Sequence, residues 1–84
     1  FGLKISPNPV NAAPYLDYIV PGSGEVTITV LNAYGQRMKV IYAGSQTAGQ
    51  YRLSLAGQLS DFARGCYFLR LQQNGKGHFI KFTK

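Results

Sequence analysis

Few residues of this 84-residue chain have the types and spacing that chemistry requires. His78 is the one histidine, and a catalytic or metal-binding imidazole needs a carboxylate or a nucleophile beside it. The three acids, Asp17, Glu25 and Asp61, lie far from one another in the sequence and form no paired-carboxylate site or calcium loop. The sequence therefore predicts no catalytic residue, no metal site and no cofactor, and we do not expect an enzyme.

Cys66 is the single cysteine, which excludes an internal disulfide and a cysteine-based zinc site. A reactive thiol needs an exposed, electropositive setting, and Arg64 is one weak neighbour of that kind. Because Cys66 alternates with Tyr67 and follows Gly65, we expect a small packed side chain instead. No helix follows Gly75-Lys76-Gly77, so these glycines are interpreted as turn residues rather than as a phosphate-binding loop.

Positive charge is concentrated at the C-terminal end of the chain, whose formal net charge is +6. Residues 1–61 carry four bases and three acids, whereas residues 62–84 carry five bases and no acid. Such asymmetry suggests an anionic partner: nucleic acid, an anionic lipid or glycolipid, or an acidic protein. The alternative is a role in solubility alone. The basic and aromatic residues resemble a stacking platform for single strands only weakly, so no nucleic-acid partner is predicted.

The elements that must position these residues are predicted to be short strands. Two-residue alternation recurs between turn signals, and no segment has a sustained 3.6-residue period. The apolar content of 45% suits one globular domain over residues 1–84, and no apolar run could span a membrane. Phe1 is not an initiator methionine, so we expect a fragment of a longer protein.

Seven strands are expected, with an irregular segment or one helical turn at Ala56–Arg64. They are Leu3–Ile5, Tyr15–Val20, Glu25–Leu31, Gln36–Ala43, Gln50–Leu55, a sixth that opens at Gly65 and a seventh that opens at Gly77 or His78. Their number and spacing indicate an all-β fold and favour an antiparallel β-sandwich over a small barrel.

The middle strands are expected to form a bulged hairpin. Asn32-Ala33-Tyr34-Gly35 fits a type I turn, and a left-handed Gly35 would add the bulge. The returning strand is expected to place Met38, Val40 and Tyr42 on one side, with Arg37 and Lys39 on the other.

The last strands are predicted to pair around a two-residue type I′ turn at Asn74-Gly75. The expected opposite pairs are Leu71/His78, Leu69/Ile80 and Tyr67/Phe82 on an apolar face, and Arg70/Phe79 and Phe68/Lys81 on the other face. The apolar face would leave His78 partly buried. The second face would stack each cation on an aromatic ring, a contact worth roughly 0.5–1 kcal/mol when exposed. At the edge of a sheet, the outer strand would be a docking edge protected only by lysines.

Four motifs in this order resemble a known family. They are Ile5-Ser6-Pro7-Asn8-Pro9, Val26 to Val40 with Gly35-Gln36-Arg37, Ala48-Gly49-Gln50-Tyr51, and Gly65 to Lys84. Together they are similar to the C-terminal sorting domain of type IX secretion system cargo in the Bacteroidetes, and the match covers almost the whole chain.

The resemblance implies an immunoglobulin-like seven-stranded antiparallel β-sandwich that is a sorting signal and not an enzyme. Such a domain reaches the periplasm folded, is recognised by the outer-membrane secretion machinery, and ends at the outer membrane or cell surface or in the medium. A sortase removes it and joins the cargo to an anionic lipopolysaccharide, or the domain is retained for docking. Recognition in the family is concentrated in the terminal segment, which here implies Gly65, Tyr67, Phe68, Arg70, Leu71, Gly75, Lys81 and Lys84.

Three features depart from the family pattern. Cys66 stands where a β-branched residue is usual, Gln36 stands where a second base is frequent, and the close at Ile80–Lys84 is unusually aromatic. A carbohydrate-binding or adhesive sandwich is the alternative function, although the absence of Trp counts against it. An exposed strand edge could also pair two copies of the chain into a homodimer.

Overall fold

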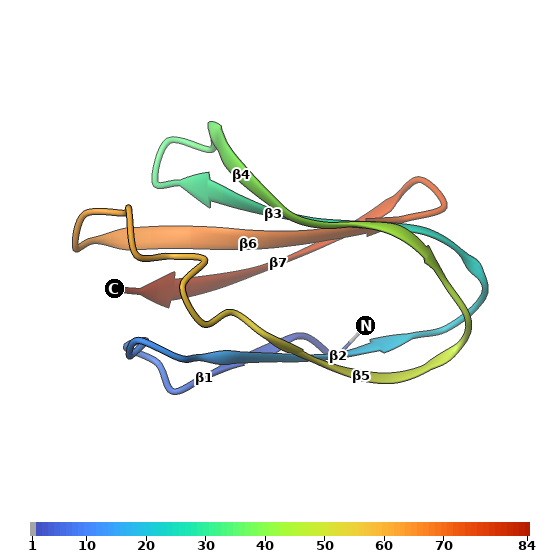
Figure 1. Cartoon of the computed structure of the whole chain (residues 1–84). Coiled ribbons are helices and arrows are strands. Elements are labelled where there is room, and N and C mark those ends of the chain that lie inside the picture. Colours follow the sequence, from blue (N-terminus) through green and yellow to red (C-terminus); the bar gives the residue numbers. More distant parts are fainter. Residues whose placement is uncertain (1) are drawn as a thin grey trace.

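The computed structural model describes residues 2–84 as an all-β fold with seven strands and no helix (Figure 1). The strands are β1 (Lys4–Ser6), β2 (Tyr15–Val20), β3 (Gly24–Asn32), β4 (Arg37–Gln46), β5 (Gly49–Ser54), β6 (Cys66–Gln73) and β7 (Lys76–Thr83). The all-β prediction is confirmed, with boundaries shifted by a few residues. The largest shift is in β4, which ends at Gln46 rather than at the expected Ala43.

The strands form two separate antiparallel sheets that face each other (Figure 1). The smaller sheet has the order β1-β2-β5, and the larger has the order β4-β3-β6-β7. Two residues, Thr47 and Ala48, carry the chain from the end of β4 in one sheet to the start of β5 in the other. Since β4 and β7 are the outer strands of the larger sheet, β3 and β6 form its centre.

The core lies between the two sheets and follows from the two-residue alternation of the sequence. Val26, Ile28 and Val30 of β3 are completely buried, as are Leu69 and Leu71 of β6. The smaller sheet and the segment after β5 contribute the other large apolar side chains, among them Leu16, Tyr18, Val20, Leu55 and Leu59. Each sheet thus buries one face and leaves the other available for contacts.

The turn between β3 and β4 has the expected geometry. Gly35 N donates to Asn32 O at 3.0 Å, and Gly35 has a φ of 82°, which an L-residue adopts at a cost. Asn32 Oδ1 also accepts hydrogen bonds from the main-chain N–H groups of Tyr34 at 2.9 Å and Gln36 at 3.0 Å. A short polar side chain therefore closes the hairpin from inside the turn.

The predicted sidedness of β4 is wrong. The β3–β4 register shifts between Ile28 and Thr29, so that Tyr42 opposes Ile28 while Val40 opposes Thr29. The extra residue between them reverses the alternation. Tyr42 packs against the core, whereas Val40 lies on the outer face and is 45% exposed. A second register shift, between Val30 and Leu31, leaves Met38 outside the Cα pairing, and its side chain is also 45% exposed.

The N-terminal segment covers part of the outer edge of β7. Val10 N donates to Thr83 O at 2.9 Å, Thr83 N donates to Asn8 Oδ1 at 3.1 Å, and Asn8 Nδ2 donates to Lys81 O at 3.4 Å. The peptide bonds before Pro7 and Pro9 are cis. The expectation that lysines alone protect this edge is therefore wrong over Lys81–Thr83.

Candidate recognition surface on the terminal hairpin

The strands β6 and β7 have the predicted register throughout. Leu71 opposes His78, Leu69 opposes Ile80, and the series continues to Tyr67 and Phe82. Asn74 and Gly75 have φ angles of 51° and 77°, as a type I′ turn requires. Turn chemistry and alternation together set this register, because a shift of one residue would turn every buried side chain outward.

Two of the eight expected recognition residues belong to the core. Leu71 is completely buried, and Tyr67 stacks between Phe62 and Phe82 at centroid distances of 5.4 and 5.7 Å. The Tyr67 hydroxyl donates to the carbonyl of Ala63 at 2.5 Å, which joins β6 to the segment before it. These side chains hold the hairpin against the core and are not available to a partner.

Three of the expected residues share the solvent-facing side of the hairpin. Phe68 opposes Lys81 across the two strands, and Arg70 lies beside them, opposite Phe79. Phe79, which was not among the expected recognition residues, is 57% exposed. We call Phe68, Arg70, Phe79 and Lys81 the hairpin outer face.

The expected cation–aromatic stacking within this face is not found. Among residues 2–84, the cation that lies over a ring is Arg52, whose guanidinium carbon is 5.1 Å from the centroid of Tyr15 on the other sheet. Arg70 Nε is buried and has no hydrogen-bond partner among the described residues. The hairpin outer face therefore presents cations and rings side by side, with one guanidinium donor unsatisfied.

The end of β7 is anchored by main-chain groups far from it in sequence. Lys84 and Gly65 exchange two hydrogen bonds, at 2.9 and 3.0 Å. Lys84 Nζ donates to the carbonyls of Leu59, of Ser60 at 3.3 Å and of Phe62 at 2.6 Å. Of the expected residues, Gly65 and Lys84 thus close the hairpin, and Gly75 forms its turn.

The comparison with protein families decides which of the sequence hypotheses applies. A family model described as a secretion system C-terminal sorting domain matches residues 4–84. The chain belongs to the type IX secretion C-terminal sorting domain family. A search of curated proteins found no match.

Membership in this family gives the sorting domain a role as a signal in type IX secretion. The family is not a catalytic one, and its role implies that the domain interacts with the secretion machinery. A protein that carries the sorting domain is accordingly secreted or displayed at the cell surface. Residues 2–84 include no helix that is long and apolar enough to cross a membrane.

The side chains with reactive groups lie apart in the sorting domain. Within residues 2–84, no three His, Cys, Asp or Glu side chains gather as metal ligands. His78 is exposed rather than partly buried, because the opposing β1 has three residues and is too short to cover all of β7. Cys66 is also exposed, so the expected packed thiol is wrong; Tyr67 takes the inward position beside it.

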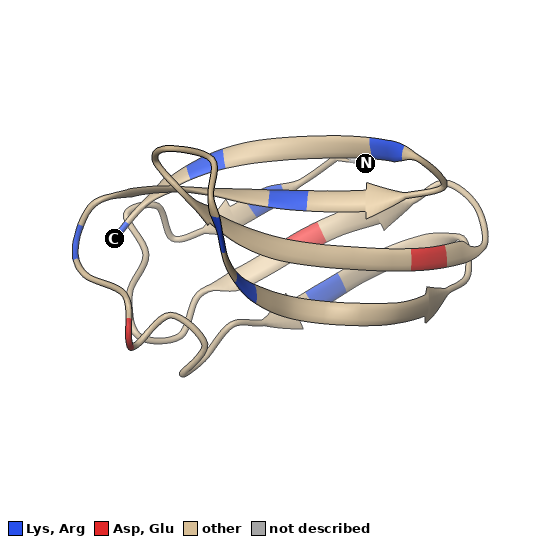
Figure 2. Cartoon of the chain, turned by 90° about the horizontal axis from the view of Figure 1, so that it is seen from above, with Lys and Arg blue, Asp and Glu red and all other residues tan. Residues whose placement is uncertain are grey.

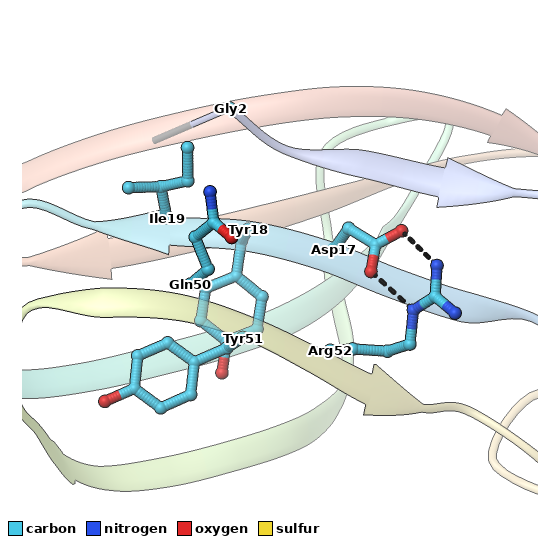
Figure 3. A pocket seen from close by; sticks show the side chains of 7 residues that line it. All are labelled: Gly2, Asp17, Tyr18, Ile19, Gln50, Tyr51 and Arg52. Carbon is cyan, nitrogen blue, oxygen red and sulfur yellow. Dashed lines mark hydrogen bonds and ion pairs between the residues drawn. The ribbon is translucent and has the colours of Figure 1, made fainter.

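The smaller sheet of the sorting domain carries an ion pair on its outer face (Figure 3). Arg52 Nε and Nη2 donate to the two carboxylate oxygens of Asp17 at 2.7 and 3.2 Å. The hydrogen bond from Arg52 is the main reason that the pKa of Asp17 lies below its ordinary value. An open pocket of about 380 Å³ lies here, lined by Gly2, Asp17, Tyr18, Ile19, Gln50, Tyr51 and Arg52.

Burial raises the pKa of Tyr18, against the lowering effect of its hydrogen bond with Gln46. Gln46 Nε2 donates to the Tyr18 hydroxyl at 2.9 Å, which links β4 to β2 across the core. Tyr18 also stacks on Tyr51, with ring centroids 5.4 Å apart. The hydrogen bond fixes the two sheets relative to each other, whereas the stacking joins β2 to β5 within the smaller sheet.

Proposed function

We propose that the domain directs an attached protein across the outer membrane by the type IX system, and that the machinery recognises it mainly through the hairpin outer face. The observation that carries this proposal is the meeting of Phe68, Arg70 and Lys81 on one accessible side of β6 and β7. In the proposal these three residues touch the machinery, together with Phe79. The remaining five residues, Gly65, Tyr67, Leu71, Gly75 and Lys84, build and anchor the hairpin.

The finer steps of the route are also part of the proposal. Residues 1–84 act as one immunoglobulin-like domain that crosses the periplasm folded and ends at the outer membrane, at the cell surface or in the medium. The domain is then removed by a sortase, which transfers the cargo to an anionic lipopolysaccharide, or it is retained for docking. The continuous core between the two sheets supports passage in a folded state.

A charge reversal on each face of the hairpin tests the proposal. We fuse the domain to an exported reporter and measure its arrival at the surface of cells with the secretion system. Lys81→Glu reverses a charge on the hairpin outer face, and Lys76→Glu makes the same change at the turn, on the other side of β7. We expect reduced delivery with Lys81→Glu alone. Equal delivery by both variants would contradict recognition through the hairpin outer face, and no delivery of the unmodified fusion would contradict the proposed function.

The carbohydrate-binding alternative gains no support from the exposed ring on the outer face of the smaller sheet. Tyr15 is an exposed aromatic ring of the smaller sheet, and the Arg52 guanidinium lies over it. Sugar stacking needs an open ring face, so Arg52 would have to move. Homodimer formation through a strand edge stays a prediction. In the larger sheet β4 is the more open edge, because Asn8 and Val10 already bond to the end of β7.

A further inference from the structure

Beyond the hairpin, the same outer face carries a second group of side chains. On β4, Val40 opposes Thr29 of β3 and Arg37 opposes Leu31, while Met38 lies between them at a register shift. Met38 and Val40 are each 45% exposed, although both are large and apolar. Met, aromatic and Arg side chains are enriched at the centres of protein interfaces relative to the rest of the surface.

Two adjacent rows of residues cross all four strands of the larger sheet. In the order β4, β3, β6 and β7, one row is Arg37, Leu31, Phe68 and Lys81, and the next is Val40, Thr29, Arg70 and Phe79. The β4 residues and the hairpin outer face therefore form one continuous surface. Leu31 is only 4% exposed and Thr29 only 1%, so both lie beneath their neighbours and fill the space between the two groups.

The charges on this surface have one sign. Figure 2 looks onto the larger sheet and shows basic segments on β4, β6 and β7, whereas the acidic segment of β3 lies at the far end. That acid, Glu25, opposes Ser45, six residues along β3 from the pairing of Leu31 with Arg37. Arg70 Nε adds a buried donor without a partner, and such unsatisfied donors are rare in folded proteins. Because Nε is buried in this conformation, a carboxylate brought by a partner would satisfy it once the Arg70 side chain turns outward.

We infer that Arg37, Met38 and Val40 extend the hairpin outer face into one docking surface for a protein of the secretion machinery, which presents an apolar centre edged by carboxylates. The inference rests on the proposed function, which makes the machinery the partner. Charge complementarity supports an acidic occupant, because Arg37, Arg70 and Lys81 surround the apolar side chains. The apolar side chains are half covered on a sheet face, which suits a complementary protein face better than insertion among lipid chains.

The test uses two residues that are matched in exposure and opposite in location. Val40 and Ile19 are both β-branched strand residues, each 45% exposed, on the outer faces of different sheets. Each is changed to Glu and to Lys in the reporter fusion. We expect Val40→Glu to lower surface delivery about tenfold or more, the effect of losing an interface contact of substantial weight. Val40→Lys should lower delivery less, because an acidic partner tolerates a cation. Both Ile19 variants should be delivered as well as the unmodified domain.

Each other outcome has a defined meaning. Delivery of Val40→Glu at the unmodified level would overturn the inference and leave the proposed function standing. A second outcome is that Val40→Glu and Val40→Lys lower delivery equally and lower the melting temperature equally. That result would show that Val40 stabilises the fold rather than contacting a partner, and it would also overturn the inference. If the unmodified fusion is not delivered, the proposed function fails and the inference fails with it.

Two further measurements separate the partner from other occupants. Binding of the domain to phosphatidylglycerol vesicles that is lost in Val40→Glu would assign the surface to anionic lipid and overturn the protein partner. A dimer in sedimentation that dissociates in the same variant would assign it to a second copy of the chain. The inference predicts that a photo-crosslinker at position 40, but not at position 19, forms an adduct in cells with a protein of the outer-membrane secretion machinery.

Discussion

Lys84 donates a hydrogen bond from its Nζ to the main-chain carbonyl of Phe62 at 2.6 Å, across a sequence separation of 22 residues. The same ammonium group also reaches the carbonyls of Leu59 and Ser60. The residue after β7 is therefore held by the segment before β6, and its side chain contributes to the fold independently of any role in recognition.

We expect Lys84→Met to lower the free energy of unfolding by about 1–3 kcal/mol, because it removes a charged donor from carbonyls that it satisfies. Lys81→Met is the matched control, since Lys81 lies on the same hairpin with an exposed side chain. Urea unfolding of both variants measures the difference. If they unfold at the same urea concentration, the carbonyl contacts of Lys84 contribute nothing to stability.

A second cysteine at position 83 should form a disulfide with Cys66. These positions oppose each other in the register, and they form a non-hydrogen-bonded pair because the neighbouring Gly65 and Lys84 exchange both main-chain bonds. Such pairs have Cα atoms about 4.5 Å apart, within the range that a disulfide accepts. We expect Thr83→Cys to lose both free thiols on oxidation and to gain up to about 3 kcal/mol of stability.

The oxidised variant also shows in which state the hairpin is recognised. The disulfide prevents β7 from leaving β6, whereas Thr83→Ser does not. Normal delivery of the oxidised fusion would show that the machinery binds β7 in place, as the docking surface requires. Selective loss of delivery in the oxidised form, restored by reduction, would show instead that the strand must separate.

Gly75→Ala should destabilise the hairpin by about 1–2 kcal/mol, the cost of a left-handed conformation for an L-residue. Gly75 has a φ of 77°, and open space surrounds the position of an added Cβ. Gly22→Ala is the control, because Gly22 also has open space but no such φ. Thermal unfolding should separate the two variants, and similar melting temperatures would exclude backbone strain as the cause.

The Asp17–Arg52 ion pair should contribute to stability in a pH-dependent way. The pKa of Asp17 in the folded chain lies below its ordinary value, mainly because of the hydrogen bond from Arg52. The contribution is therefore complete above about pH 3.9, the usual pKa of an unfolded Asp, and is lost as pH falls through the lower folded pKa. Urea unfolding between about pH 6 and pH 2 should show this loss of stability. Asp17→Asn should remove the part of the pH dependence that comes from the ion pair.

The terminal hairpin could be predicted from sequence because local signals determine it. Asn74-Gly75 favours a type I′ turn, and the charges and alternation around it agree with the register of that turn. The anchoring of Lys84 could not be predicted in the same way, because its partners are carbonyls in an irregular segment. Main-chain carbonyls carry no sequence signature, and only the packing of the two sheets brings them to the ammonium group.

The outer face of β4 was missed for a different reason. Two extra residues, Ile41 and Met38, change the alternation along β4, and nothing in their residue types marks the two bulges. The predicted side shared by Met38, Val40 and Tyr42 therefore split into an outward and an inward part. Cys66 illustrates a related error: its size suited a packed position, whereas its place in the alternation with Tyr67 put it outside.

The hydrogen bonds of Asn8 with Lys81 and Thr83 connect positions 73 and 75 residues apart. Contacts of such separation require nearly the whole chain to be ordered, and proteins rich in them fold slowly. This closure should be among the last events of folding. Until the two ends of the chain have met, the edge of β7 stays open to pairing with other strands. The rate at which the two ends meet therefore sets how long a newly made domain is exposed to aggregation.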